Sequence, residues 1–203
     1  MFVVMRDPLG AVPRPRRRSD ARRSIDAILK AARVVLDGRP DASMEEIAAT
    51  AGVTRQTVYA HFPSRDALIE ALIRTAGAET LAAIDAARLE AIPPTDALRQ
   101  FLDIGWELIR LNSHLLIPAL TQNPPGSSEP HDAGTARLEQ IIRRGQQSGD
   151  FDPTLPATWL TAAVVGLFRA ASEQVAAGVI TTSKAAALVV ESSLKLCRAA
   201  DPR

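Results

Sequence analysis

The sequence predicts an all-α protein in which a small three-helix unit is followed by a larger helical body. Apolar residues recur with the 3.6-residue period of helices along most of the chain. No sustained two-residue alternation rich in Val, Ile and Thr occurs between turn residues, which disfavours strands. Hydrophobic residues form 46% and charged residues 23% of the 203 positions, proportions that are ordinary for a chain that folds in water.

The first two helices are predicted from their end signals. One face of residues 20–37 is apolar, and Gly38 ends that pattern. Ser43 and Glu46 have the spacing of a capping box, in which each side chain bonds the backbone N–H of the other residue. The second helix is therefore expected to begin after Ser43 and to end at Gly52, which supplies a turn.

A short third helix and a long fourth helix follow the turn. Thr54 is an N-cap for the third helix, and Phe62-Pro63-Ser64 interrupts it. Ser64 caps the fourth helix, expected to reach about Arg88, and Pro93-Pro94 ends that unit. Later helices are expected from Thr95 or Asp96 to about Ile109, at Leu115–Leu120, and at about 129–148, 156–177 and 182–199, with a loop at Asn123–Ser128.

Two short helices joined by a glycine turn form a helix-turn-helix, and the third helix exposes residues suited to the major groove. Arg55 can donate two hydrogen bonds to guanine, Gln56 can pair with adenine, and Thr57 can meet a thymine methyl group or a base edge. Tyr59 and Arg65 can donate to phosphate oxygens, which would fix the register on a duplex.

Charge is unevenly distributed along the chain. Up to Arg65 there are 12 Lys and Arg against 7 Asp and Glu, and beyond it there are 12 against 16. A basic N-terminal third suits a polyanion, and an aromatic content of only 4% favours a duplex over single strands. Arg16, Arg17 and Arg18 lie in a predicted flexible arm, 1–18, which is expected either to contact DNA or to be a solvated tail.

Five consecutive motifs in the basic third look like the DNA-binding domain of TetR-family regulators. They are Ser43-Met44-Glu45-Glu46-Ile47-Ala48, Ala51-Gly52-Val53-Thr54, Thr57-Val58-Tyr59, His61-Phe62 and Ser64-Arg65-Asp66-Ala67-Leu68. The match covers roughly residues 20–73, whereas the rest resembles the family only in being helical, with a familiar segment from Arg144 to Phe168. The family usually has lysine where Arg65 stands, and many members carry a small residue where Gln56 stands.

The resemblance and the residue chemistry together predict the DNA-contacting residues and the domains. The DNA-contacting residues are Ser43, Thr54, Arg55, Gln56, Thr57, Tyr59, His61 and Arg65. Val58 and Phe62 are assigned to the core of the small domain, without a role on DNA. A helix-turn-helix domain is expected over 19–65, and a helical domain for ligand binding and dimerisation over 66–203.

The body has most of the large rings in surroundings of Ala, Leu and Val. A cavity lined by such rings and a few polar groups would bind a small hydrophobic effector, as the resemblance implies; alternatively, the rings only fill the core. The predicted pocket residues are Phe101, Trp106, His114, Gln122, Trp159 and Phe168. The last two helices have apolar faces that could pair with a second copy through Leu160, Val164, Leu167, Val189, Val190 and Leu194.

Several classes of function are disfavoured. No G-x-S-x-G, phosphate loop or H-E-x-x-H occurs, so an enzyme, a cofactor and a metal site are not expected. The single cysteine, Cys197, allows no intramolecular disulfide, which points to a reducing cytoplasm. The run Phe2–Met5 is too short for the apolar part of a signal peptide, and no apolar stretch is long enough for a membrane span.

The sequence thus predicts a homodimeric repressor of the TetR type that binds a palindromic operator in double-stranded DNA and is released by a small hydrophobic ligand. A ligand-dependent activator or co-repressor fits the same residues. A helical small-molecule-binding protein without sequence-specific DNA binding is the alternative from another class. Selection from random duplexes would separate these classes, since only a sequence-specific regulator returns a palindrome.

Overall fold

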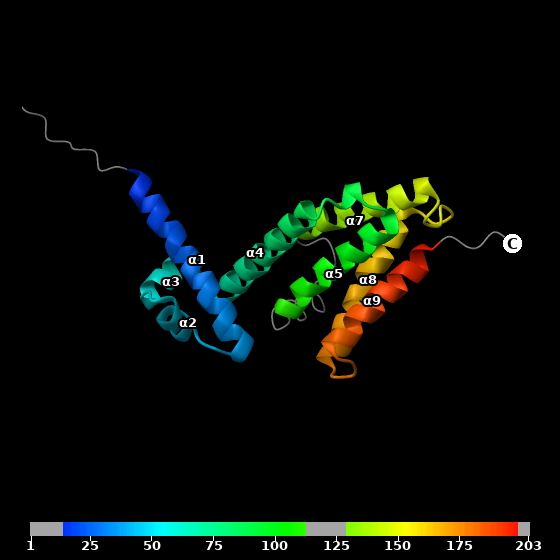
Figure 1. Cartoon of the computed structure of the whole chain (residues 1–203). Helices are drawn as coiled ribbons and strands as arrows, with labels where there is room; N and C mark the ends of the chain where they lie inside the picture. Colours follow the sequence, from blue (N-terminus) through cyan, green and yellow to red (C-terminus); the bar gives the residue numbers. More distant parts are fainter. Residues whose placement is uncertain (1–13, 113–128, 199–203) are drawn as a thin grey trace, which may run out of the picture. The chain divides into compact units, whose positions relative to one another are not determined.

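The computed structural model describes residues 14–112 and 129–198, and side chains over 19–112 and 133–198. These residues form helices joined by turns, with one isolated antiparallel bridge between Phe151 and Arg198. The chain divides into two compact units, one ending at Arg65 and the other beginning at Asp66. The predicted all-α fold is confirmed for the described residues (Figure 1).

The first unit contains helices α1 (Arg14–Gly38), α2 (Met44–Ala51) and α3 (Arg55–His61). All three pack against one another around a core that includes Ile28, Ile47 and Val58, each fully buried. Helix α1 begins at Arg14, so residues 14–18 of the predicted arm are helical. Arginine is a good helix former, and proline is tolerated in a first turn, so the basic run can extend the helix.

The end signals of α2 act as the sequence predicts. The hydroxyl of Ser43 accepts from the backbone N–H of Glu46 at 3.3 Å, and the Ser43 N–H donates to Glu46 Oε2 at 2.8 Å. Both halves of the capping box are thus present. Gly52 follows the helix with a φ of 68°, a left-handed conformation that glycine adopts without steric cost.

The second unit contains α4 (Arg65–Ala86, from Asp66 onward), the 3₁₀ helix η1 (Leu89–Ala91), α5 (Pro94–Leu111), α7 (Glu129–Ser148), α8 (Ala157–Ala176) and α9 (Thr182–Cys197). The expected helices at 129–148, 156–177 and 182–199 are confirmed to within two residues. Pro94 begins α5 instead of only ending the preceding unit, because proline fits the first helical turn. The predicted segments Leu115–Leu120 and Asn123–Ser128 lie outside the described residues.

A shared apolar core holds the body together. Helix α5 packs against α7 and α9, and α8 packs against both α7 and α9 (Figure 1). The most enclosed side chains of this core include Leu98, Leu102, Leu138, Ile142 and Leu160. Burial of such side chains contributes about 1.5–3 kcal/mol each relative to leaving them exposed.

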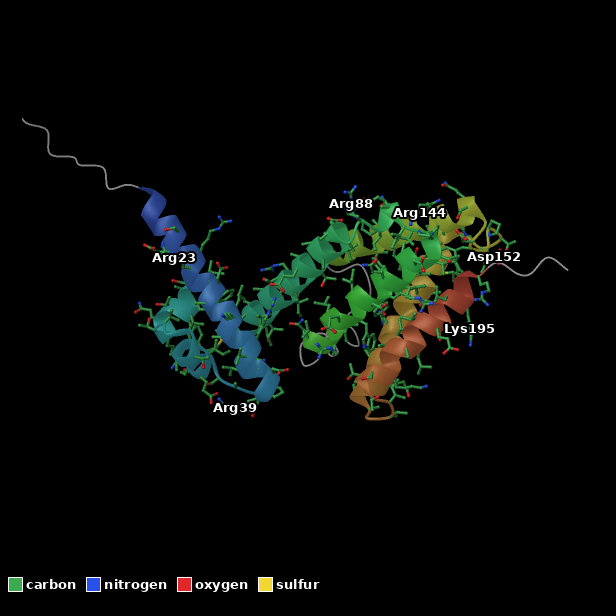
Figure 2. All side chains as sticks on the ribbon, in the orientation of Figure 1. Arg23, Arg39, Arg88, Arg144, Asp152 and Lys195 are labelled. Carbon is green, nitrogen blue, oxygen red and sulfur yellow. The ribbon has the colours of Figure 1, made fainter. Side chains whose placement is uncertain are left out.

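Helix α7 also bonds the segment that follows α4. The guanidinium Nη2 of Arg144 donates to the carbonyl oxygens of Leu89 and Ile92, at 2.8 and 2.9 Å. Arg137 forms an ion pair with Asp85, in the last turn of α4, with Nε and Oδ1 3.0 Å apart. Arg88, labelled in Figure 2 with Arg144, has a left-handed φ of 48° just before η1. Two arginines of α7 thus hold the end of α4 and the chain beyond it.

Candidate nucleic-acid interface

The turn between α2 and α3 is closed by backbone hydrogen bonds and a threonine cap. The Gly52 N–H donates to Ala49 O at 3.2 Å, and the Val53 N–H donates to Ala48 O at 3.1 Å. The Thr54 hydroxyl then accepts from the Thr57 N–H at 3.1 Å, so the predicted N-cap is confirmed. These bonds fix how α3 leaves α2, which is the arrangement of a helix-turn-helix.

Helix α3 has one buried side and one exposed side. Val58 is fully buried and Phe62, just after the helix, is 7% exposed, so their assignment to the core is confirmed. Arg55 and Gln56 are exposed, and Tyr59 is 38% exposed. A helix of two turns that carries these polar groups outward has the size and chemistry to enter a major groove.

The four remaining predicted residues with hydroxyl or imidazole groups differ in the contacts that they make within the protein. The hydroxyls of Thr54 and Thr57 lie 2.8 Å apart and bond each other, so both take part in the cap. Ser43 is occupied by the capping box. His61 is half-buried, with its ring 6.5 Å from the ring of Phe62. A role of these residues on DNA stays a prediction.

Arg55 is held by a neighbouring helix. Its Nη1 lies 2.6 Å from Oε1 of Glu45, in the first turn of α2. The guanidinium carbon lies 5.3 Å from the centroid of the Tyr59 ring, within the range of a cation–π contact. Arg55, Glu45 and Tyr59 therefore form one cluster on the exposed side of the helix-turn-helix.

Arg65 and Arg39 both contact residues near the start of α2. Arg65, in its half-buried position, donates to the carbonyl oxygen of Pro40, which uses part of its guanidinium within the first unit. Arg39 pairs with Glu46 of the capping box. The Ser43 backbone N–H, and next the Arg39 guanidinium, hold the pKa of the Glu46 carboxyl below its usual range. Glu46 therefore stays ionised to lower pH than a free glutamate.

The basic N-terminal residues belong to α1. Arg16, Arg17 and Arg18 lie in its first turns, and their side chains are outside the described set. Arg22 and Arg23 follow on the same helix with exposed side chains, and Arg23 is labelled in Figure 2. The contact of Arg23 with Asp20, at 3.6 Å, leaves both side chains mostly in solvent. The helix therefore places its basic residues along about three turns.

The predicted pocket is only partly consistent with the structure. Phe101 and Trp106 are buried and Phe168 is half-buried, with the rings of Trp106 and Phe168 5.9 Å apart. The indole N–H of Trp106 donates to Thr182 O at 3.1 Å. These rings pack into the core, and ligand contact by them stays a prediction. His114 and Gln122 lie outside the described residues.

Trp159 contradicts the pocket prediction. Its side chain is 62% exposed, because it lies on the side of α8 opposite Leu160 and Val164. Two open clefts occur on the described part of the body. One of about 490 Å³ lies between α5 and α9, and one of about 440 Å³ lies beside α7 and η1. None of the predicted pocket residues lines either of them.

The predicted dimer residues also need correction. Leu160, Val164, Val189 and Val190 are at most 8% exposed and belong to the core of their own chain, so their assignment to a surface between copies is wrong. The apolar periodicity that suggested an interface is satisfied inside the subunit. The exposed side of α8 instead has Trp159, Ala162, Gly166 and Ala170. Leu167 and Leu194 are half-buried and stay predictions.

The sequence did not predict the pairing of Glu45 with Arg55 or the contacts made by Arg137 and Arg144. Glu45 is part of the recognised motif, but its pairing with Arg55 depends on how α2 packs against α3. Arg137 and Arg144 stand 7 residues apart on α7, a spacing that puts them on one face, yet no pattern in the sequence identifies their partners.

Over residues 14–112 and 129–198, no three His, Cys, Asp or Glu side chains are grouped as metal ligands would be. None of the helices in those ranges combines the length and apolar character needed to cross a membrane.

Comparison with known proteins agrees with this geometry. The family described as "Bacterial regulatory proteins, tetR family" matches residues 28–72, which include α2 and α3. The "HTH-type transcriptional repressor LfrR" of Mycolicibacterium smegmatis is 30% identical over 147 residues, 72% of this chain and 76% of LfrR. The "HTH-type transcriptional regulator NfxB" of Pseudomonas aeruginosa is 28% identical over 142 residues, 67% of this chain and 74% of NfxB.

The fold extends the likeness to the body. The crystal structure of LfrR from Mycobacterium smegmatis in complex with proflavine superposes with a TM-score of 0.61 at 27% identity, covering 86% of this chain and 96% of LfrR. The identity with LfrR over most of both chains, the match at the helix-turn-helix and the common fold lead to one assignment. The chain belongs to the TetR family of bacterial regulatory proteins and is a transcriptional regulator, not an enzyme.

Proposed function

We propose that the chain is a homodimeric repressor that binds a palindromic operator through two copies of α3 and leaves it when a small hydrophobic ligand binds the body. The observation that carries this proposal is the capped, two-turn α3 with Arg55, Gln56 and Tyr59 on its exposed side. The name of LfrR as a repressor supports the sign of regulation.

The residues of the helix-turn-helix divide into two roles. Arg55 reads guanine, Gln56 reads adenine and Thr57 meets a thymine methyl group or a base edge. Phosphate contacts that set the register come from a second set. That set is Ser43, Thr54, Tyr59, His61 and Arg65, with added positive charge from Arg16, Arg17 and Arg18 at the start of α1.

Dimerisation follows from the size of α3. Seven residues reach few base pairs, so specificity requires a second recognition helix about 34–36 Å away, one turn of the duplex. The exposed side of α8 supports self-association, because Trp159, Ala162, Gly166 and Ala170 form an uncharged surface with small side chains that allow close approach. Leu188 of α9, 36% exposed, adds a further apolar side chain.

Release by a ligand requires a movement of α4. This helix is continuous from Arg65, the last residue of the first unit, to Ala86, and its far end is held by Arg137 through Asp85. A ligand that prefers one position of α4 changes the spacing of the two recognition helices. It can shift this equilibrium only by its difference in affinity for the two states, about 1.4 kcal/mol per tenfold change.

Selection from random duplexes at stated salt tests the operator. The full-length protein is expected to enrich a palindrome with half-site centres about one helical turn apart. Recovery of duplexes without common sequence would contradict the proposal and favour a helical small-molecule-binding protein.

Proflavine is the probe for the ligand, since LfrR was solved with it. Binding is expected to quench the emission of Trp106, measured in the variant W159F so that the exposed indole does not contribute. The same concentration of proflavine should release the selected duplex. Quenching with unchanged duplex affinity would rule out proflavine as an inducer, and tighter duplex binding would identify a co-repressor.

A further inference from the structure

Arg55 in the free protein uses only part of its hydrogen-bonding capacity. The contact with Glu45 involves Nη1, at 2.6 Å, and the guanidinium lies over the Tyr59 ring. Nε and Nη2, which form the side-on edge of the guanidinium, make no hydrogen bond to another described residue. This edge presents two parallel N–H donors, the arrangement that matches guanine O6 and N7.

The ion pair between Glu45 and Arg55 is a weak source of stability. Arg55 and Glu45 are 64% and 46% exposed, and ion pairs at that exposure contribute little to folding. A carboxylate beside the recognition helix also opposes DNA binding, because it approaches the phosphate backbone with the same sign of charge. The backbone that carries Glu45 is nevertheless fixed, since the capping box of Ser43 and Glu46 holds the first turn of α2.

We propose that Glu45 is a positioning residue that makes Arg55 selective for guanine. By binding Nη1 while the guanidinium lies over Tyr59, it leaves the Nε–Nη2 edge as the one that meets a base. A flexible arginine without this contact could turn to a phosphate instead, which would give affinity without sequence preference. At a pair without guanine, Arg55 gains no bidentate base contact and the repulsion by Glu45 remains.

This inference rests on the proposed contact of Arg55 with a base, so the experiment first locates that contact. Affinities of the full-length wild type and R55A are measured on the selected duplex and on duplexes with single pairs replaced. The base pair that the wild type discriminates and R55A does not is called the Arg55 position. There the wild type should discriminate by about 5- to 150-fold, the range of a bidentate arginine–guanine pair.

Substitution E45Q then tests the positioning role. It should reduce discrimination at the Arg55 position by at least about fivefold, while affinity for the replaced duplex stays equal or rises because a negative charge is removed. The matched control is D41N. Asp41 is exposed in the connection between α1 and α2 and forms no ion pair with a described residue. D41N removes the same charge and should keep the wild-type discrimination.

Each other outcome overturns the inference in a recognisable way. Equal discrimination in E45Q, in E45A, whose side chain accepts no hydrogen bond, and in D41N would show that Glu45 does not orient Arg55. Equal loss of affinity on both duplexes would show a structural role. If E45Q still changes discrimination in the R55A background, Glu45 contacts the base itself. If R55A discriminates as the wild type does at every position, the proposed role of Arg55 fails, and that of Glu45 fails with it.

Discussion

Phe151 packs against Gly145 of α7 without room for a further atom. A Cβ built on Gly145 would lie 2.1 Å from Cδ2 of the Phe151 ring, and that ring is 2% exposed. The ring closes one end of the body core, where the Phe151 N–H also donates to Gly145 O at 3.0 Å. Glycine is required here for close approach and not for an unusual backbone conformation.

Substitution G145A should therefore destabilise the protein. The new methyl group forces a buried ring to move, and overpacking of this kind costs about 1–3 kcal/mol. The melting temperature is expected to fall by about 2–4 °C per kcal/mol for a chain of this size. The control is G134A on the same helix, where a Cβ meets nothing within 4 Å. It should stabilise by about 0.5–1 kcal/mol, because alanine restricts the unfolded chain. Equal changes in both variants would contradict this account.

Arg55 and Arg65 should differ in what they contribute to DNA binding. R55A is expected to relax base preference at one position of the selected duplex, and R65A to lower affinity by a similar factor on every duplex. R65A also loses the hydrogen bond to the Pro40 carbonyl, so its melting temperature must be measured beside the titrations. Similar losses for both variants on all sequences would refute the division between base and phosphate contacts.

The helix-turn-helix was predictable because its signals are local. The capping box at Ser43, the left-handed Gly52 and the cap at Thr54 each involve residues at most a few positions apart, and all three occur as expected. The pairing of Arg55 with Glu45 spans two helices. No local pattern distinguishes it from the alternatives open to an exposed arginine.

The surfaces of the body were not predictable for a different physical reason. Helix α8 is apolar on two sides, one with Leu160 and Val164 and the other with Trp159 and Ala162. Periodicity shows that such faces exist, but packing against α7 and α9 decides which one enters the core. Leu160 and Val164, predicted for the dimer surface, therefore lie on the inner side of α8, and Trp159, predicted for the pocket, lies on the exposed side.

The exposed side of α8 now predicts the oligomeric state. Gly166 is exposed, and a Cβ there meets nothing within 4 Å, so G166R should fold as the wild type does. If this surface joins two copies, the long charged side chain should yield monomers in sedimentation velocity and weaken operator binding. The control A136R introduces the same side chain at an exposed position of α7 and should remain dimeric. A dimer formed by G166R would place the interface elsewhere.

The two arginines that hold the end of α4 should differ in their effect on stability. R144M removes two hydrogen bonds to the carbonyls of Leu89 and Ile92, an expected loss of about 1–3 kcal/mol. R137A breaks only an ion pair with partners 41% and 51% exposed, expected to contribute below about 1 kcal/mol. Urea unfolding measures both. A larger loss in R137A would show that the ion pair, and not the carbonyl contacts, anchors the segment.

Cys197 should behave as a buried thiol whose ionisation opposes folding. The side chain is fully buried, and burial raises the pKa of the Cys197 thiol to about 11. The folded state therefore keeps its proton where the unfolded thiol, with a pKa near 8.5, has lost it. The stability that this pKa difference contributes is complete below the pKa of the unfolded thiol and is lost as pH rises toward 11.

The melting temperature of the wild type should fall more steeply than that of C197A between about pH 9 and 10.5. Parallel declines in the two proteins would show that other groups govern alkaline unfolding. Native protein at pH 8 should also react with a thiol reagent far more slowly than protein unfolded in guanidinium chloride.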